Sequence, residues 1–150
     1  MKKWLVGLML ALATSSIAVP ESFANLRDFK VKELRCMAEA IYKEARGEPL
    51  KGQLAVGQVV LNRVYNYDYY PNTICKVIFQ KDQFQWTKGF SGFTAPSEYI
   101  MLAAKVISGK HEMSKFKATH FHANYVRPKW KLRKIAVIGN HIFYKHETRN

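Results

Sequence analysis

The chain has 150 residues, with 24 lysines and arginines against 11 aspartates and glutamates, which gives a formal net charge of +13 at pH 7. No low-complexity segment, internal repeat or long linker interrupts it, so its length suits one domain with a single core. A charge of this size favours an anionic partner, and nucleic acid is the first class to consider. The alternative is that the charge only keeps the protein soluble.

The N-terminus has the pattern of an export signal. Two lysines precede an apolar stretch from Trp4 to Val19, which is shorter than the about 20 residues of a membrane span. Small residues then allow cleavage after Ala24. We expect residues 1–24 to be a signal peptide and residues 25–150 to be the exported domain, with an uncleaved signal anchor as the alternative. Cleavage removes two lysines and one glutamate, leaving 22 basic and 10 acidic side chains.

Export changes the expected partner and the expected chemistry of the cysteines. An exported protein meets the cell wall and lipid surfaces before nucleic acid, and peptidoglycan carries peptide carboxylates that attract a basic protein. The only cysteines are Cys36 and Cys75. An even number in an exported chain favours a disulfide. Two unpaired buried thiols are the alternative, and a metal site from two cysteines so far apart is disfavoured.

Two helices are predicted in the first half of the chain. From Asp28 to Arg46, apolar residues recur at three- and four-residue steps, and Gly47 and Pro49 end the pattern. From Gly52 to Val64, apolar residues cover most of the helix circumference, which is typical of a helix at the centre of a domain. Asn62-Arg63 near its end is polar and would either face a site or cap the helix.

The rest of the chain predicts short elements, and the whole therefore predicts a helix-rich α+β domain with a small β element. The segments, in order, are a tyrosine-rich loop at 65–73, a short helix at 74–79, a short strand or hairpin at 83–93, a helix at 96–108, a strand at 119–126 and a second apolar stretch at 135–144 that contains Gly139-Asn140.

Glu44 is the first candidate for chemistry. It lies on the flank of the apolar face of the first helix, three residues after Ile41. Desolvation there would raise its pKa, as a general acid that splits a glycosidic bond requires. The alternative is a solvated glutamate paired with Lys43 or Arg46. Glu48, just past the helix, is either a second site carboxylate or, as we favour, a partner of Arg46 that supports the turn.

Enzymes that cleave glycosidic bonds usually use two carboxylates, and no second acid stands out here. Asp68 in the tyrosine-rich loop and Asp82 before Gln83 could each approach the site. One acid without a partner also fits a mechanism in which a hydroxyl of the substrate attacks. In that case a single glutamate acts first as acid and then as base.

Two further groups could line a site. Gln83, Phe84, Gln85 and Trp86 offer aromatic faces for sugar rings and amides for sugar hydroxyls, although Phe84 and Trp86 could equally be core residues.

His120, His122 and Asn124 would share one face of a strand. A His-x-His pair binds zinc only with a third ligand, such as His111, His141 or a carboxylate. We favour contacts to substrate or support of Glu44 for these residues.

Together these stretches resemble the SleB/CwlJ-type cell wall hydrolases, a family named for spore cortex-lytic enzymes, from about Leu34 to Tyr144. The matching stretches are CMAEAIY (36–42), EARGEP (44–49), GQLAVGQVVLNRV (52–64), PNTIC (71–75), DQFQW (82–86), ATHFHANYVRPKW (118–130) and IGNHIFYK (138–145).

The resemblance implies a lysozyme-like domain, similar to lytic transglycosylases and resuscitation-promoting factors. It implies cleavage between N-acetylmuramic acid and N-acetylglucosamine with 1,6-anhydromuramoyl ends, and Glu44 as the catalytic acid. The residues expected to bind substrate or support the site are Glu48, Arg46, Gln83, Phe84, Trp86, His120, His122 and Tyr125.

We further expect no metal or cofactor, no nucleic-acid partner and a monomer. The expected location is periplasmic or secreted, with membrane contact only through an uncleaved N-terminal segment, as in a signal-anchored phage lysin. Two other functions stay open at this point. One is a zinc-dependent peptidoglycan hydrolase built on His120 and His122, and the other is a non-catalytic module that binds wall polymer.

Overall fold

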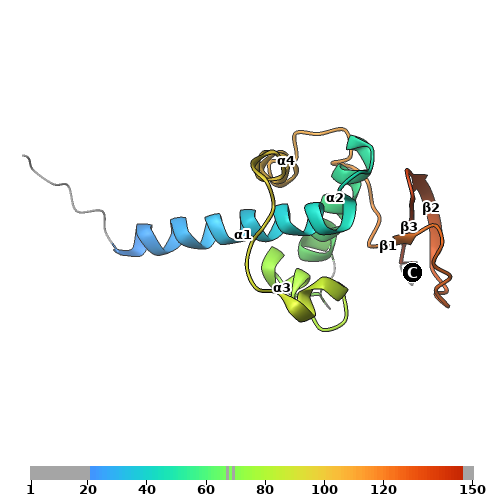
Figure 1. Ribbon diagram of the computed structural model, residues 1–150, viewed down its shortest axis with the longest axis horizontal. Helices are drawn as coiled ribbons and strands as arrows, with labels where there is room; N and C mark the ends of the chain where they lie inside the picture. The colour runs from blue at the N-terminus through green and yellow to red at the C-terminus, as the bar shows by residue number, and fades with distance from the viewer. Residues whose placement is uncertain (1–20, 67, 69, 147–150) are drawn as a thin grey trace, which may run out of the picture.

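The computed structural model describes residues 21–66, 68 and 70–146 (Figure 1). Most of the predicted signal peptide, residues 1–20, therefore lies outside the described residues. Within the described ranges, no helix has both the length and the apolar character needed to cross a bilayer.

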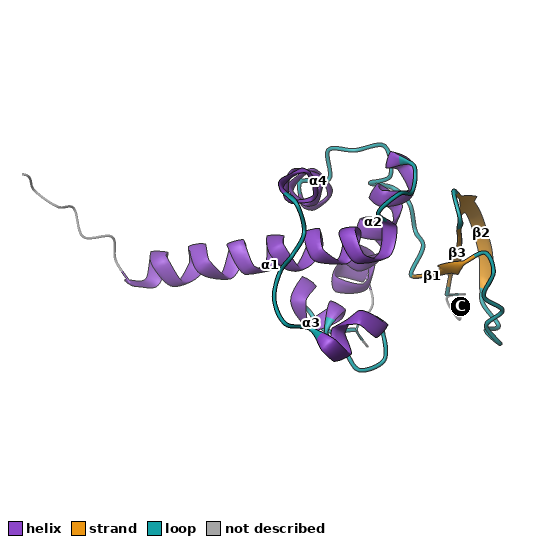
Figure 2. Cartoon of the chain, in the orientation of Figure 1, coloured by secondary structure: helices purple, strands orange, loops and turns teal. Residues whose placement is uncertain are grey.

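A long helix, α1 (Glu21–Ala45), is the axis of the domain, and α2 (Leu50–Asn66), α3 (Ile74–Ile78) and α4 (Ser97–Ile107) pack around its C-terminal half. Figures 1 and 2 show that its N-terminal half extends past the other helices. The predicted start at Asp28 was wrong, because the helix already begins at Glu21. The sequence holds no glycine or proline from Glu21 to Arg46 that would interrupt it.

The core is built on α2, as its all-round apolar pattern predicts. Leu54, Val56 and Val59 are at most 2% exposed. Gly57 allows α2 to approach its neighbours closely, since a Cβ there would lie 3.0 Å from Val106 of α4 and 3.1 Å from Ile41 of α1. The predicted disulfide between Cys36 and Cys75 is confirmed and joins α1 to α3.

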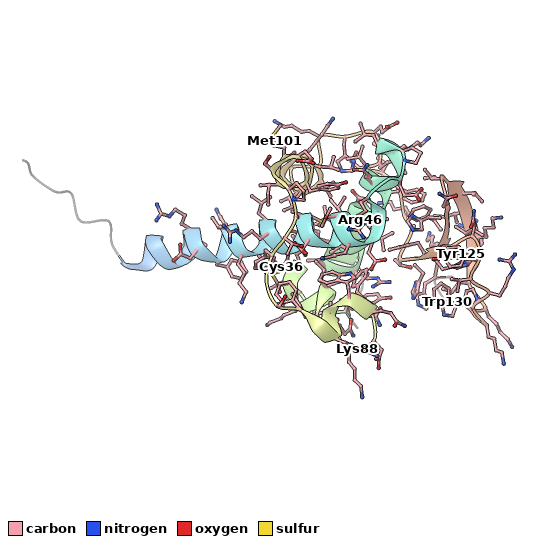
Figure 3. All side chains as sticks on the ribbon, viewed as in Figure 1. Cys36, Arg46, Lys88, Met101, Tyr125 and Trp130 are labelled. Carbon is pink, nitrogen blue, oxygen red and sulfur yellow. A yellow bond between two sulfur atoms is a disulfide. The ribbon has the colours of Figure 1, made fainter. Side chains whose placement is uncertain are left out.

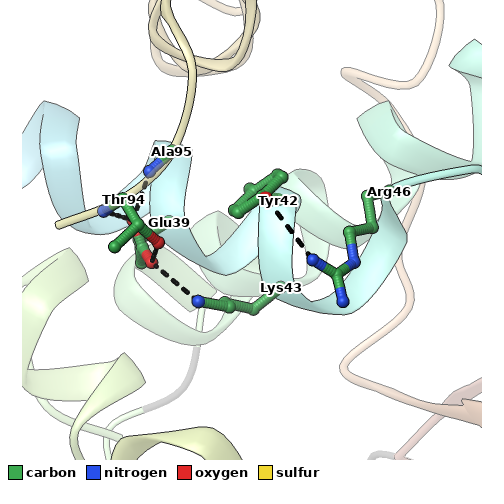
Figure 4. A network of polar contacts seen from close by, with 6 residues as sticks. All are labelled: Glu39, Tyr42, Lys43, Arg46, Thr94 and Ala95. Carbon is green, nitrogen blue, oxygen red and sulfur yellow. Dashed lines mark hydrogen bonds and ion pairs between the residues drawn. The ribbon is translucent and has the colours of Figure 1, made fainter.

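A buried carboxylate fastens the segment before α4 to α1 (Figure 4). Glu39 accepts hydrogen bonds from the backbone N–H of Thr94 at 2.7 Å and of Ala95 at 2.8 Å, and from the Thr94 hydroxyl at 2.8 Å. Lys43 Nζ lies 3.5 Å from its Oε1. Burial alone would raise the pKa of Glu39, but these hydrogen bonds and the lysine together lower it.

A three-stranded antiparallel sheet stands beyond the C-terminal end of α1 (Figure 1). Its strands are β1 (His120–Ala123), β2 (Arg133–Ile138) and β3 (His141–Lys145), in the order β1-β3-β2. The apolar stretch at 135–144 is thus a hairpin that turns at Gly139-Asn140. The α+β class is confirmed.

The segment at 83–93 is not the predicted strand or hairpin. It forms a short 3₁₀ helix, η1 (Gln85–Gly89), followed by a loop. Its aromatic rings make edge-to-face contacts: the Phe90 ring centroid lies 5.2 Å from that of Phe93 and 4.9 Å from that of Phe79, which follows α3. These ring contacts, rather than pairing with a partner strand, hold the segment in place.

Candidate active site

A cavity of about 680 Å³ lies between the C-terminal part of α1, the segment at 82–85 and the sheet. It gathers most of the residues expected to form the site, namely Glu44, Gln83, Phe84, His120, His122 and Tyr125. Residues 44, 83 and 120 are far apart in the sequence, so the cavity exists only because the sheet packs against the helices. We refer to it below as the cleft.

Glu44 enters the cleft from the last turn of α1. Within the described residues it forms no ion pair, since Lys43 pairs with Glu39 and Arg46 contacts the Tyr42 hydroxyl at 3.4 Å. The alternative of a solvated, paired glutamate is therefore wrong. Burial raises the pKa of Glu44, and neither the neighbouring Trp86 indole nor the Arg63 guanidinium cancels this effect.

The Trp86 indole N–H is poised beside this carboxyl group. It is close enough to oppose the rise in the pKa of Glu44. Its nitrogen is nevertheless buried, with no hydrogen-bond partner in ordinary geometry among the described residues. An unsatisfied buried donor is uncommon in proteins. Trp86 thus places its indole N–H as a hydrogen-bond donor beside the Glu44 carboxyl group.

Arg63 is the central cation of the site. The side chain, 5% exposed, donates from Nε to the Thr119 carbonyl at 2.8 Å and from Nη1 to Gln83 Oε1 at 3.0 Å. Its guanidinium also lies 5.8 Å from the centre of the Phe84 ring. Burial lowers the pKa of Arg63, and nearby Glu44 opposes this shift. Of the two options open for Asn62-Arg63, facing the site is confirmed for the arginine.

The neighbouring Asn62 fastens the chain just before β1. Its Nδ2 donates to the carbonyls of Phe116 and Ala118, at 2.7 Å each. The end of α2 therefore fixes the segment that leads into the histidine strand, and Arg63 at the next position fixes Thr119. This pair of residues sets where His120 and His122 enter the cleft.

The two histidines of β1 share one face, as the alternation predicts, and both pack against Trp130. The Trp130 ring centre lies 5.4 Å from that of His120 and 5.6 Å from that of His122. Burial, Arg63 and His146 lower the pKa of His120 to about 4, so its ring is neutral near pH 7. His122 stacks on Tyr144 and meets its hydroxyl at 2.9 Å through Nε2.

The geometry bears on the zinc alternative. His122 Nδ1 lies 2.8 Å from the Ala123 carbonyl, so both of its ring nitrogens are engaged. His141 lines the cleft, but across residues 21–66, 68 and 70–146 no three His, Cys, Asp or Glu side chains gather as a metal site. The described residues therefore do not supply the third ligand that this alternative needs.

Glu48 and Arg46 lie outside the cleft, and their predicted pairing was wrong. Glu48 Oε2 accepts the backbone N–H of Asn140 at 2.8 Å, and Oε1 accepts its side-chain amide at 3.2 Å. Arg46 stacks on Tyr42, with its guanidinium 5.3 Å from the ring centre. Glu48 does support a turn, but that turn belongs to the β2–β3 hairpin.

Asp82 and Asp68, the two candidates for a second carboxylate, differ in their position relative to the cleft. Asp82 lines the cleft, with a side chain that is 60% exposed and 3.1 Å from Lys88 Nζ. Asp68 is exposed and is not among the residues that line the cleft. Of these two acids, only Asp82 is therefore placed to act in the cleft.

Sequence reasoning missed Lys43 and Trp130 as cleft residues. Nothing in the local pattern singled out Lys43. Trp130 belongs to the ATHFHANYVRPKW stretch, and an aromatic residue inside a basic run was the signal that could have found it.

Residues 47–144 match the model of a family described as Cell Wall Hydrolase. The chain belongs to the cell wall hydrolase family. It is 32% identical over 119 residues to the spore cortex-lytic enzyme of Bacillus cereus, covering 78% of this chain and 46% of that protein. The corresponding enzyme of Oceanobacillus iheyensis is 31% identical over 134 residues, covering 88% of this chain and 46% of that protein. This cell wall hydrolase thus spans less than half the length of these curated relatives.

Two solved structures share the fold. The catalytic domain of the Bacillus cereus SleB protein matches 75% of this chain and 89% of its own with a TM-score of 0.64, at 33% identity. The catalytic domain of the germination-specific lytic transglycosylase SleB from Bacillus anthracis matches 75% of this chain and 93% of its own, with a TM-score of 0.65 and 33% identity. The predicted lysozyme-like fold and the resemblance to SleB are confirmed.

Proposed function

We propose that this cell wall hydrolase cleaves the peptidoglycan bond between N-acetylmuramic acid and N-acetylglucosamine, with Glu44 as the proton-transfer group. The observation that carries the proposal is a half-buried carboxyl group of raised pKa in a cleft that also presents Phe84, Tyr125 and Trp130. A protonated carboxyl group is what departure of a sugar oxygen requires. The matched family range begins just after Glu44, so its role depends on this geometry.

The reaction that fits one acid is a transglycosylation within the substrate. Glu44 gives its proton to the glycosidic oxygen while the bond from that oxygen to the muramic anomeric carbon breaks. The muramic C6 hydroxyl oxygen bonds to the same carbon, and its proton passes to the Glu44 carboxylate. The products are a 1,6-anhydromuramoyl end and a free glucosamine hydroxyl, and the enzyme recovers its starting protonation state.

The surrounding residues have defined tasks in this scheme. Arg63 holds the Gln83 amide at 3.0 Å, which orients it for sugar hydroxyls and N-acetyl groups. The Trp86 indole N–H donates to the Glu44 carboxyl group and stabilises the carboxylate that forms when the proton has left. Trp130 and Tyr125 supply aromatic faces on the opposite wall.

A second candidate is simple hydrolysis, and Asp82 is the observation that favours it. Asp82 lines the same cleft, so its carboxyl group is placed to act as a base on a water molecule. Mass spectrometry of the muropeptides released from purified sacculi separates the two reactions. Anhydro ends support transglycosylation, whereas reducing muramic ends identify a muramidase and reducing glucosamine ends a glucosaminidase.

Glu44→Gln tests the role of the acid. It should lower the release of muropeptides by about 10²–10⁴-fold, the range of a lost general acid. Glu98→Gln, an exposed glutamate of α4, is the matched control and should keep full activity. Full activity of Glu44→Gln would rule out Glu44 as the proton-transfer group. Inhibition by a chelator would favour the zinc alternative, and sacculus binding without fragment release would favour a binding module.

We propose that the protein acts outside the cytoplasm, because the proposed substrate lies in the cell wall. Removal of residues 1–24 stays a prediction, and N-terminal sequencing of the exported protein should find Asn25 first. An intact Met1 on membrane-bound protein would favour the signal anchor. The monomeric state also stays a prediction, which sedimentation analysis of the mature chain checks.

A further inference from the structure

The stretch from residue 113 to residue 146 is basic and contains no acidic residue. Residues 113–146 contain eight lysines and arginines and no aspartate or glutamate. Five of these cations fall in residues 125–134, which we call the basic segment, and all five are exposed: Arg127, Lys129, Lys131, Arg133 and Lys134.

These cations are not used by the fold for ion pairing. In the part of the chain that the structure describes, the ion pairs join Lys43 to Glu39 and Lys88 to Asp82, and none involves the basic segment. Arg127 donates only to backbone carbonyls, those of Asn124 and Val126. Five like charges in ten residues repel one another, so the fold alone gains nothing from them.

The basic segment forms one wall of the cleft. Its apolar side chains, Tyr125, Val126 and Trp130, line the cavity, and Trp130 packs against both cleft histidines. Tyr125 is 82% exposed and Trp130 45% exposed. Figure 3 shows both at the sheet end of the molecule, where nitrogen-tipped side chains project outward. The segment thus presents aromatic rings to the cleft and positive charge to the solvent beside it.

This division matches the chemistry of a substituted glycan. The sugar rings of peptidoglycan are recognised by aromatic faces and hydrogen bonds, and the lactyl carboxyl group of a muramic unit carries no charge while an amide bond joins it to a stem. The peptide stems, which branch from the muramic units, end in carboxylates. A strand seated against Tyr125 and Trp130 would therefore bring stem carboxylates to the rim of the cleft, where the cations lie.

We propose that the basic segment binds the peptide-stem carboxylates of the glycan strand held in the cleft. This interaction surface deepens the proposed function and rests on it, since it assumes that peptidoglycan occupies the cleft. Complementary charge of this kind guides encounter and sets which strands are held. It predicts a preference for strands with free stem carboxylates over strands whose stem carboxylates have been amidated.

The test measures binding of the Glu44→Gln protein to purified sacculi by co-sedimentation, so that no substrate is consumed. The pair Lys129→Glu and Lys131→Glu reverses two charges of the basic segment. The matched control reverses Lys30 and Lys32, two exposed lysines on the part of α1 that extends away from the sheet. Circular dichroism confirms that each variant is folded.

The basic-segment pair should weaken binding by at least about tenfold, because one cation near an anionic surface contributes roughly fivefold. The control pair should retain near-parental affinity. Amidation of the stem carboxylates should weaken the parent to the level of the basic-segment pair, with no further loss in that pair. Raising the salt to about 1 M, where the Debye length is about 3 Å, should have the same effect.

Several results would overturn the proposal. Equal losses in the two variant pairs would mean attraction by overall charge. Equal binding of native and amidated strands would mean that the segment contacts sugars alone. A basic-segment pair that still binds sacculi but loses binding to duplex DNA or to anionic phospholipid vesicles would assign the surface to that partner. All of these binding experiments use the Glu44→Gln protein, which is not expected to cleave the substrate. A negative binding result therefore leaves the cleavage assay of the proposed function unaffected.

Discussion

The carboxylate of Glu48 holds the backbone N–H of Asn140 at 2.8 Å, across a sequence separation of 92 residues. This contact joins the junction between α1 and α2 to the turn of the β2–β3 hairpin. The sheet carries one wall of the cleft, and Glu44 enters from the other wall. Glu48 therefore sets the distance between the two walls without lining the cleft.

Loss of this contact should destabilise the protein. Glu48→Ala removes two hydrogen bonds at an exposed site and should lower the free energy of unfolding by about 0.5–1.5 kcal/mol. Gly139→Ala should have a similar effect, since Gly139 has φ +56° and a Cβ there would collide with the Glu48 carboxylate. Urea denaturation measures both, and Glu112→Ala on the surface should stay within about 0.5 kcal/mol of the parent. A parental midpoint for Glu48→Ala would contradict the role of this contact.

Glu44→Gln should make the protein more stable near neutral pH. The pKa of Glu44 is raised above its ordinary value of 4.5, so the folded state holds this proton more tightly than the unfolded state. The stabilisation is complete below the unfolded pKa and is lost as the pH rises through the folded pKa. Glutamine does not ionise, so the variant does not lose this stability as the pH rises. We expect its free energy of unfolding at pH 7 to exceed that of the parent by about 0.5–2 kcal/mol. Thermal melts should show the gain shrinking towards pH 4, and a destabilised variant at pH 7 would count against a desolvated Glu44.

Trp86→Phe should move the pH profile of activity. Burial raises the pKa of Glu44, and the indole N–H partly offsets this rise. Removing the indole N–H should therefore raise the pKa of Glu44 further. Because the acid must be protonated to act, the alkaline limb of the rate profile should shift to higher pH. Phe84→Leu is the control, since it alters an aromatic neighbour without removing a hydrogen-bond donor. A limb that stays in place in Trp86→Phe would show that the indole does not act on this carboxyl group.

His120→Gln should reduce the sensitivity of the fold to acid. Burial, Arg63 and His146 depress the pKa of His120 from 6.5 to about 4, so the unfolded state takes up this proton first as the pH falls. Stability is therefore lost between about pH 6.5 and pH 4. The loss from this group should be about 1–2 kcal/mol, less than the full shift implies because the ring is partly exposed. The free energy of unfolding of parent and variant is measured at pH 7 and at pH 4, and the difference between the two falls is the contribution of His120. Equal falls would refute this contribution.

The Cys36–Cys75 disulfide closes a long loop, with a sequence separation of 39. Replacing both cysteines by alanine should lower the free energy of unfolding by about 4 kcal/mol, as the loop-entropy relation gives for this length. Urea denaturation with and without a reductant checks this. The parent should lose stability on reduction, whereas the double variant should not respond to the reductant.

Much of the helical scaffold could be read from the sequence. The three- and four-residue apolar steps that lead to Ile41 place α1, and the all-round apolar α2 is the buried helix it predicts. The position of Glu44 on the flank of an apolar face was enough to anticipate its desolvation. These features follow from helix periodicity, which acts over a few neighbouring residues and is written directly in the order of side chains.

The partners of those residues were decided by tertiary packing. Glu48 was expected to meet Arg46 two residues away, but it binds Asn140 instead. Arg63 reaches Thr119 and Gln83, and Trp130 closes over the histidines of β1. The contacts of Glu48 and Arg63 join residues 20 to 92 positions apart and depend on how the sheet docks on the helices, and no local pattern encodes that docking. The sequence by itself therefore determined that Glu44 lies at the edge of an apolar helix face, whereas the tertiary structure decided which side chains surround it and that Glu39 is buried as well.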